Sequence, residues 1–242
     1  MRHLILCSVM WLCGLMMAVG QNVPQVIPAL QQWKSAKGKL VLPETGKVIV
    51  SLDEEIELKG EAEILVQDLK EMFGWEYSVV IGKKEKGAVY LTLGKPDKTL
   101  GEEGYRMNIQ GEVTIEAPTS KGVFWGTRTL LQMLHNQPEG LMKGRATDFP
   151  LYPNRGFMID VGRKFFTMDY LRDYVKILSF YKMNELQVHL NDNGFVEFFD
   201  NDWNKTYAAF RLESERFPGL TAKDGSYTKE EFRDFQIMAA RY

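Results

Sequence analysis

The chain has 242 residues, of which 45% are hydrophobic and 26% are charged. This composition is ordinary for a globular protein and excludes a disordered or low-complexity chain. The formal net charge of −2 at pH 7 gives no reason to expect nucleic acid or an anionic membrane as a partner. The length suits one large domain or two modest ones.

Residues 1–20 have the pattern of a secretory signal peptide. Arg2 supplies positive charge, and residues 4–19 are almost wholly apolar. Ala18 and Gly20 are small residues in the positions that signal peptidases require, so we expect cleavage after Gly20 and export to the periplasm or the exterior. The apolar run is shorter than the roughly 18–20 residues that span a bilayer, so we expect no stable membrane insertion. A retained anchor and a lipid-modified Cys13 are the alternatives.

Both cysteines, Cys7 and Cys13, lie inside this segment, so the mature chain has no thiol. We therefore expect no disulfide, no cysteine nucleophile and no cysteine-ligated metal. Nothing else in the sequence calls for a metal or an organic cofactor, and we expect neither.

Residues 21–150 have the mixed pattern of an α+β domain. Short apolar runs predict strands at Lys47–Val50, Tyr77–Ile81 and Ala88–Leu93. A helix with one apolar face is predicted from Glu61, and Gly74 is expected to end it.

A hairpin and a second helix follow in the same domain. Alternating apolar residues predict strands at 105–109 and 113–115, joined by a two-residue turn at Gln110-Gly111 with positive φ at the glycine. The second helix has Thr119 or Ser120 as its N-cap and ends at residues 136–138. No carboxylate pair, metal cluster or phosphate loop stands out here, so we expect a packing or positioning domain.

The pattern changes around residues 145–153, where we place a domain boundary at residue 150. A strand is predicted at Gly156–Asp160, then a helix capped by Thr167, then a strand at Leu186–Leu190. Residues 228–231 form a capping box that opens a second helix. This strand–helix–strand–helix series predicts a parallel sheet with functional groups at the carboxyl ends of its strands, and two units cannot close such a sheet.

Two stretches resemble the family-20 glycoside hydrolases, the secreted β-N-acetylhexosaminidases. One runs from Glu103 to Gln132, and the other comprises residues 155–166 together with residues 189–195. The resemblance implies an α+β N-terminal domain (residues 21–150) without catalytic groups. It also implies that residues 151–242 are the first two β/α units of a (β/α)8 TIM barrel, which is incomplete in this chain.

The resemblance also implies hydrolysis of terminal β-linked N-acetylhexosamine with retention of configuration, in which the substrate's own acetamido oxygen is the nucleophile. The family's acid and amide-orienting residue are an adjacent Asp-Glu pair at the fourth barrel strand. The acidic runs at residues 53–55 and 230–231 do not fit that place. We therefore expect no catalytic residue in this chain, the pair to lie beyond Tyr242, and the chain alone to be inactive.

Two residues match the family's sugar-binding positions. Arg155 matches an arginine at the first strand that binds ring hydroxyls, for which a planar guanidinium is well suited; an interdomain salt bridge is the alternative. Asp192 matches the first acid of an Asp-Asp pair whose second member is here Asn193, and a loop-structuring role is equally open. A structural network at the strand ends is expected from Asp160, Arg163 and His189.

The expected partner is a glycan with terminal N-acetylhexosamine. Two other functions remain open from the sequence. One is a carbohydrate-binding module without catalysis, and the other is a glycosidase of a different family with the same two-domain architecture.

Overall fold

The computed structural model describes residues 23–242. The predicted signal peptide, residues 1–20, lies outside the described residues. Among the helices of residues 23–242, none is long and apolar enough to cross a membrane.

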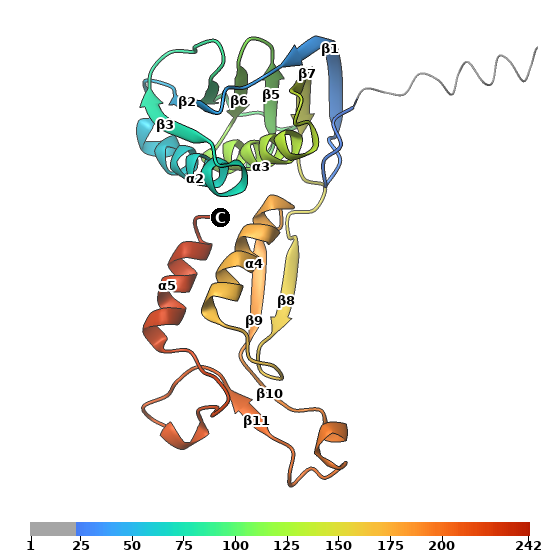
Figure 1. Ribbon diagram of the computed structural model, residues 1–242, viewed down its shortest axis with the longest axis vertical. Helices are drawn as coiled ribbons and strands as arrows, with labels where there is room; N and C mark the ends of the chain where they lie inside the picture. Colours follow the sequence, from blue (N-terminus) through green and yellow to red (C-terminus); the bar gives the residue numbers. More distant parts are fainter. Residues whose placement is uncertain (1–22) are drawn as a thin grey trace, which may run out of the picture.

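The first domain is a mixed sheet of seven strands with two helices on one face (Figure 1). The strands lie in the order β1-β7-β5-β6-β4-β2-β3. Their bounds are β1 (Gln32–Leu40), β2 (Thr45–Val50), β3 (Glu76–Ile81), β4 (Val89–Leu93), β5 (Tyr105–Ile109), β6 (Val113–Ala117) and β7 (Leu141–Asp148). The helices are α2 (Glu55–Phe73) and α3 (Ser120–Asn136). The predicted α+β character of this domain is confirmed.

Helix α3 is almost entirely buried against the sheet of this domain. Every residue from Gly122 to Leu134 is buried. Thr119 is the N-cap, and its side chain accepts a hydrogen bond from the Gly122 N–H at 3.3 Å. At Gly126 a Cβ would stand 2.4 Å from Ile115, so glycine is needed for the helix to lie this close to β6.

Two local predictions for this domain were wrong, and two strands were not predicted. Helix α2 begins at Glu55 rather than Glu61, since its first turn is mostly exposed and its N-cap, Glu54, makes no side-chain cap. Strand β7 (Leu141–Asp148) was not predicted and runs into the region where we expected the pattern to change, and β1 was not predicted because most of its residues are exposed. The hairpin loop has three residues, and Gly111 does not have positive φ. Gly74 does, at 72°, as predicted for the end of α2.

The second domain begins with a parallel pair of strands, β8 (Gly156–Asp160) and β9 (Glu185–His189), joined by α4 (Met168–Phe180). A long connection follows, with β10 (Asn191–Asn193), the 3-10 helix η1 (Val196–Phe199), β11 (Ala208–Phe210) and the 3-10 helix η2 (Pro218–Leu220). It leads to α5 (Lys229–Ala239), which packs beside α4. The Thr167 cap and the capping box of Thr228 and Glu231 are both present, as predicted.

The amino ends of β8 and β9 adjoin the helical face of the first domain, and their carboxyl ends point away from it (Figure 1). Helix α4 contacts α3 across this junction. After α5 the chain returns to the first domain, where the Tyr242 ring lies edge-on to Phe124 with 6.5 Å between ring centroids. One edge of the two-stranded sheet is thus in contact with the first domain and the other is not.

Candidate functional site

Four polar side chains meet at the carboxyl edge of β8 and β9. Asp160 and His189 are the last residues of these strands and are paired in register. Arg163 bridges two carboxylates: Nη1 donates to Asp160 at 2.5 Å, and Nη2 lies 2.8 Å from Asp192. The Nε2 atom of His189 is 2.8 Å from the same Asp192 oxygen, Oδ2. We call Asp160, Arg163, His189 and Asp192 the carboxyl-edge cluster.

The backbone brings the turns after the two strands into direct contact. The N–H groups of Val161 and Gly162 both donate to the carbonyl of His189, at 3.1 and 3.0 Å. A Cβ on Gly162 would stand 2.7 Å from the backbone nitrogen of Asp192. Glycine is therefore needed at position 162 for Arg163 to reach Asp192.

Hydrogen bonds keep both carboxyl groups of the cluster ionised. A hydrogen bond with His189 lowers the pKa of Asp192, and the Asn193 N–H and the charge of Arg163 add to this against a desolvation cost. For Asp160, burial opposes ionisation, but hydrogen bonds from the Arg163 backbone and guanidinium outweigh it and lower the pKa. Asp160, Arg163 and His189 are thus linked in one network that runs through Asp192.

The composition of the cluster suits recognition of neutral polar groups. The Arg163 side chain is 34% exposed and the Asp192 side chain 26% exposed, so both can reach a ligand. The Phe195 ring lies 5.1 Å from the Arg163 guanidinium and is 54% exposed. The donor atoms of Asp160, His189 and Asp192 lie within 4.8 Å of one another, but Arg163 already supplies the positive charge between the two carboxylates, and we assign no metal.

Arg155 lies at the opposite edge, directly before β8. Its Nη2 donates to Glu103 of the first domain at 2.6 Å, and its side chain is 14% exposed. Its Nε donates to the Lys182 carbonyl and its Nη1 to the Tyr152 carbonyl, at 2.6 and 2.9 Å. The guanidinium lies 5.3 Å from the Trp125 ring centroid. The interdomain ion pair, the alternative for this residue, is what the structure contains.

A buried polar network at the same junction was missed by the sequence analysis. The Lys182 ammonium lies 2.7 Å from Asp148 and 3.0 Å from the Tyr105 hydroxyl. That hydroxyl donates to Asp148 at 2.8 Å and is 2.6 Å from the Thr129 hydroxyl. Burial lowers the pKa of Lys182, and the adjacent Asp148 opposes this shift. The Lys182 backbone has φ of 60°, which is rare for a residue with a side chain, but this is visible only in the structure.

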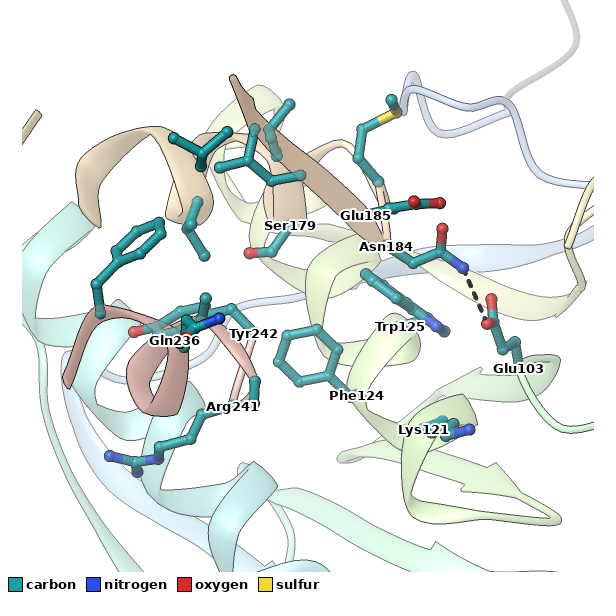
Figure 2. A pocket seen from close by; sticks show the side chains of 18 of the residues that line it. Glu103, Lys121, Phe124, Trp125, Ser179, Asn184, Glu185, Gln236, Arg241 and Tyr242 are labelled. Atoms are coloured by element: carbon teal, nitrogen blue, oxygen red, sulfur yellow. Dashed lines mark hydrogen bonds between the residues drawn. The ribbon is translucent and has the colours of Figure 1, made fainter. Parts of the chain in front are cut away.

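A cavity of about 850 Å³ lies between the two domains. Figure 2 shows Phe124 and Trp125 of α3 in its lining and the Glu103–Asn184 hydrogen bond at its rim. Apolar residues of β9, the residue that follows it and α5 also line it (Leu186, Val188, Leu190, Phe232 and Phe235). None of the residues of the carboxyl-edge cluster lines it, so we do not place the ligand here.

Comparisons with known proteins agree with this architecture. Residues 23–149 match the family model described as glycosyl hydrolase family 20, domain 2, and residues 152–241 match glycosyl hydrolase family 20, catalytic domain.

Among curated relatives, a beta-hexosaminidase of Akkermansia muciniphila is 31% identical over 146 residues, covering 59% of this chain and 30% of that protein. A beta-hexosaminidase of Porphyromonas gingivalis is 26% identical over 238 residues, covering 89% and 28%. Among solved structures, a mutant Streptomyces plicatus beta-hexosaminidase in complex with GlcNAc has a TM-score of 0.72 and 26% identity, covering 90% of this chain and 44% of that one. The chain thus spans less than half the length of each.

Proposed function

The chain belongs to glycosyl hydrolase family 20, and from this premise we propose that it is part of an enzyme that removes terminal β-linked N-acetylhexosamine from glycans. The observation that carries the proposal is the carboxyl-edge cluster, because catalytic domains built on parallel β/α units bind their substrates at this edge. The similarity to two beta-hexosaminidases and the GlcNAc complex of the Streptomyces plicatus enzyme support the choice of sugar.

Within this proposal, Arg163 and Asp192 contact the hydroxyl groups of the terminal sugar. A guanidinium can donate to two vicinal oxygens through its planar fork, and a carboxylate can accept from a third hydroxyl. Among the described contacts of Arg163, one N–H of each Nη is used by a carboxylate, which leaves further N–H groups for a ligand. We propose Arg163 for this role in place of Arg155, whose guanidinium is engaged at the domain junction.

The proposed reaction is retaining and substrate-assisted. The acetamido oxygen of the substrate attacks the anomeric carbon while an acid protonates the leaving oxygen. The acidic runs of this chain have structural partners instead: Glu54 accepts the Leu93 N–H at 2.9 Å, and Glu231 closes the capping box of α5. We therefore propose that the acid and the amide-orienting carboxylate are not supplied by these 242 residues, and that the chain alone does not turn over substrate.

The proposal includes export through the segment 1–20, on the sequence pattern described above. It also includes a domain boundary at about residue 150, with a first domain that supports the second and has no catalytic groups.

Two measurements test the proposal. Titration of the isotope-labelled chain with N-acetylglucosamine should move the amide signals of Arg163, His189 and Asp192, and in Arg163→Ala the signals of His189 and Asp192 should respond only at about ten- to a hundredfold higher sugar concentration. No response at these signals would remove the assigned sugar site. In parallel, a chromogenic N-acetyl-β-glucosaminide should not be cleaved by the chain alone but should be cleaved when the chain is joined to the rest of a family-20 catalytic domain. Binding without cleavage in that fusion would favour the carbohydrate-binding alternative.

A further inference from the structure

Arg211 is the most completely bonded side chain of the second domain's long connection. It follows β11 and is 1% exposed. Its five N–H groups donate five hydrogen bonds, the full number that a guanidinium can make. Nε donates to the Val161 carbonyl at 2.7 Å, and Nη2 donates to the Gly162 carbonyl at 3.1 Å and to Asp224 at 3.2 Å. Nη1 donates to Asp224 and to the Gly225 carbonyl, at 2.5 and 2.9 Å.

The two carbonyls of the β8 turn that Arg211 holds immediately precede Arg163. The N–H groups of the same two residues, Val161 and Gly162, donate to the His189 carbonyl. This short turn is thus fixed on its N–H side by β9 and on its carbonyl side by Arg211. The backbone of Arg211 adds a third link, since its N–H donates to the Leu190 carbonyl at 3.0 Å.

The far side of Arg211 is itself fixed. Its hydrogen bonds, followed by one from the Tyr207 hydroxyl, lower the pKa of Asp224, so this carboxylate is ionised at neutral pH. The Phe165 ring lies 5.6 Å from the guanidinium. Gly225 has φ of 149°, and a Cβ there would stand 2.4 Å from the same ring. The chain around Arg211 is therefore packed too closely to shift freely.

We propose that Arg211 is a positioning residue for the sugar site, holding the turn at residues 161–162 so that Arg163 reaches both Asp160 and Asp192. The inference rests on the proposed function, because it gives Arg163 its sugar contact. Arg211 is too deeply buried to touch a substrate, so its effect on binding passes through the backbone of this turn. A lysine at this position keeps the charge but has three donors on one nitrogen. These cannot reach both the carbonyls of residues 161–162 and the acceptors at residues 224–225.

The test compares Arg211→Lys with Arg128→Lys in the whole chain. Arg128 is an equally buried arginine of the first domain, 2% exposed, whose Nη1 lies 2.6 Å from Asp68. Both variants should lower the melting temperature. Arg211→Lys should shift the amide and guanidinium NMR signals of Arg163 and weaken N-acetylglucosamine binding about tenfold, the loss expected for one charge-assisted contact. Arg128→Lys should change neither.

A double-mutant cycle sharpens the assignment. If Arg211 acts through Arg163, Arg211→Lys should have no further effect on sugar affinity in an Arg163→Ala background. Additive effects, or Arg163 signals that stay in place in Arg211→Lys, would overturn the inference. If the unmodified chain does not bind the sugar at all, the proposed site fails, and the Arg163 signals alone still decide whether Arg211 positions this turn.

Discussion

The two edges of the β8–β9 sheet carry similar residues that contact different parts of the molecule. Arg155 precedes β8 and Arg163 follows it. The first forms an ion pair with Glu103 of the other domain and donates to backbone carbonyls. The second bridges two carboxylates of its own domain and remains one-third exposed. Strand direction thus separates the two arginines: the amino edge contacts the neighbouring domain, whereas the carboxyl edge, where we propose the sugar site, does not.

Ion pairs at the two edges should also differ in how much they contribute to the stability of the fold. At the amino edge the Lys182–Asp148 pair is buried, and both side chains are less than 10% exposed. Removing one partner of such a pair leaves an uncompensated charge in a low-dielectric environment. At the carboxyl edge the ion pairs are partly solvated, so each contributes little to stability. Substitutions should therefore destabilise the fold at one edge and weaken binding at the other.

The largest expected effect follows from Lys182→Met. It leaves Asp148 buried without its cation and should lower the free energy of unfolding by about 3–5 kcal/mol. Urea denaturation followed by far-UV circular dichroism measures this change. The control is the double variant Lys182→Met, Asp148→Leu, which should recover part of the loss because no charge is then left unpaired. A loss below about 1 kcal/mol in the single variant, the range of a surface pair, would contradict the buried-pair interpretation.

The next largest effect is expected from replacing Arg163, the proposed sugar contact. Arg163→Ala should weaken N-acetylglucosamine binding by about ten- to a hundredfold, from the loss of about 1.5–3 kcal/mol at about 1.4 kcal/mol per decade, with little change in melting temperature. Arg163→Lys should recover only part of the affinity, because an ammonium lacks the planar fork.

Arg155→Ala should do the reverse, lowering the melting temperature while the affinity of the folded chain stays the same. Calorimetry and sugar titration of Arg155→Ala and Arg163→Ala show which of the two arginines contacts the sugar. Weakened binding in Arg155→Ala with an unchanged melting temperature would restore Arg155 as the sugar contact.

A smaller effect is expected from Gly162→Ala, which tests the contact between the two turns. Its Cβ would meet the backbone of Asn191 and Asp192, so the turns must separate, at a cost of about 1–3 kcal/mol. The NMR signals of Arg163 should move as its bridge to Asp192 lengthens. Gly60→Ala is the matched control, because a Cβ there meets nothing within 4 Å and should stabilise α2 by about 0.5–1 kcal/mol. Equal stability changes at the two glycines would show that the turns are not in close contact.

The sequence predicted the features whose signals are local. The caps at Thr167 and Thr228 depend on neighbours within three residues, and the parallel strands depend on short segments in which apolar residues are consecutive (β8) or alternate with polar ones (β9). The partners of Arg155 and Lys182 could not be predicted, because Glu103 is 52 residues away from the one and Asp148 is 34 residues away from the other. The sequence analysis assigned the sugar contact to Arg155 rather than to Arg163, and here the sequence did contain a signal against that assignment. Strand direction alone places Arg155 at the amino edge, and this signal was present in the sequence.

The smallest effect concerns pH at the carboxyl edge. The pKa values of Asp160 and Asp192 are lowered by their hydrogen bonds and by Arg163, so the folded chain releases these protons more readily than the unfolded chain. The stability that they contribute is therefore fully present above the ordinary aspartate pKa of about 3.9 and is lost as the pH falls below it through the folded values. Between about pH 5 and pH 8 neither carboxylate changes charge, so they should cause no change in sugar affinity there, while below about pH 4 affinity should fall as the Arg163 bridge loses its acceptors. Sugar titrations from pH 3 to pH 8 measure this, with Asp192→Asn as the control, since it removes one of the two titrating groups and should weaken the acid dependence. An affinity that begins to fall above about pH 5 in the unmodified chain but not in Asp192→Asn would contradict the lowered pKa of Asp192.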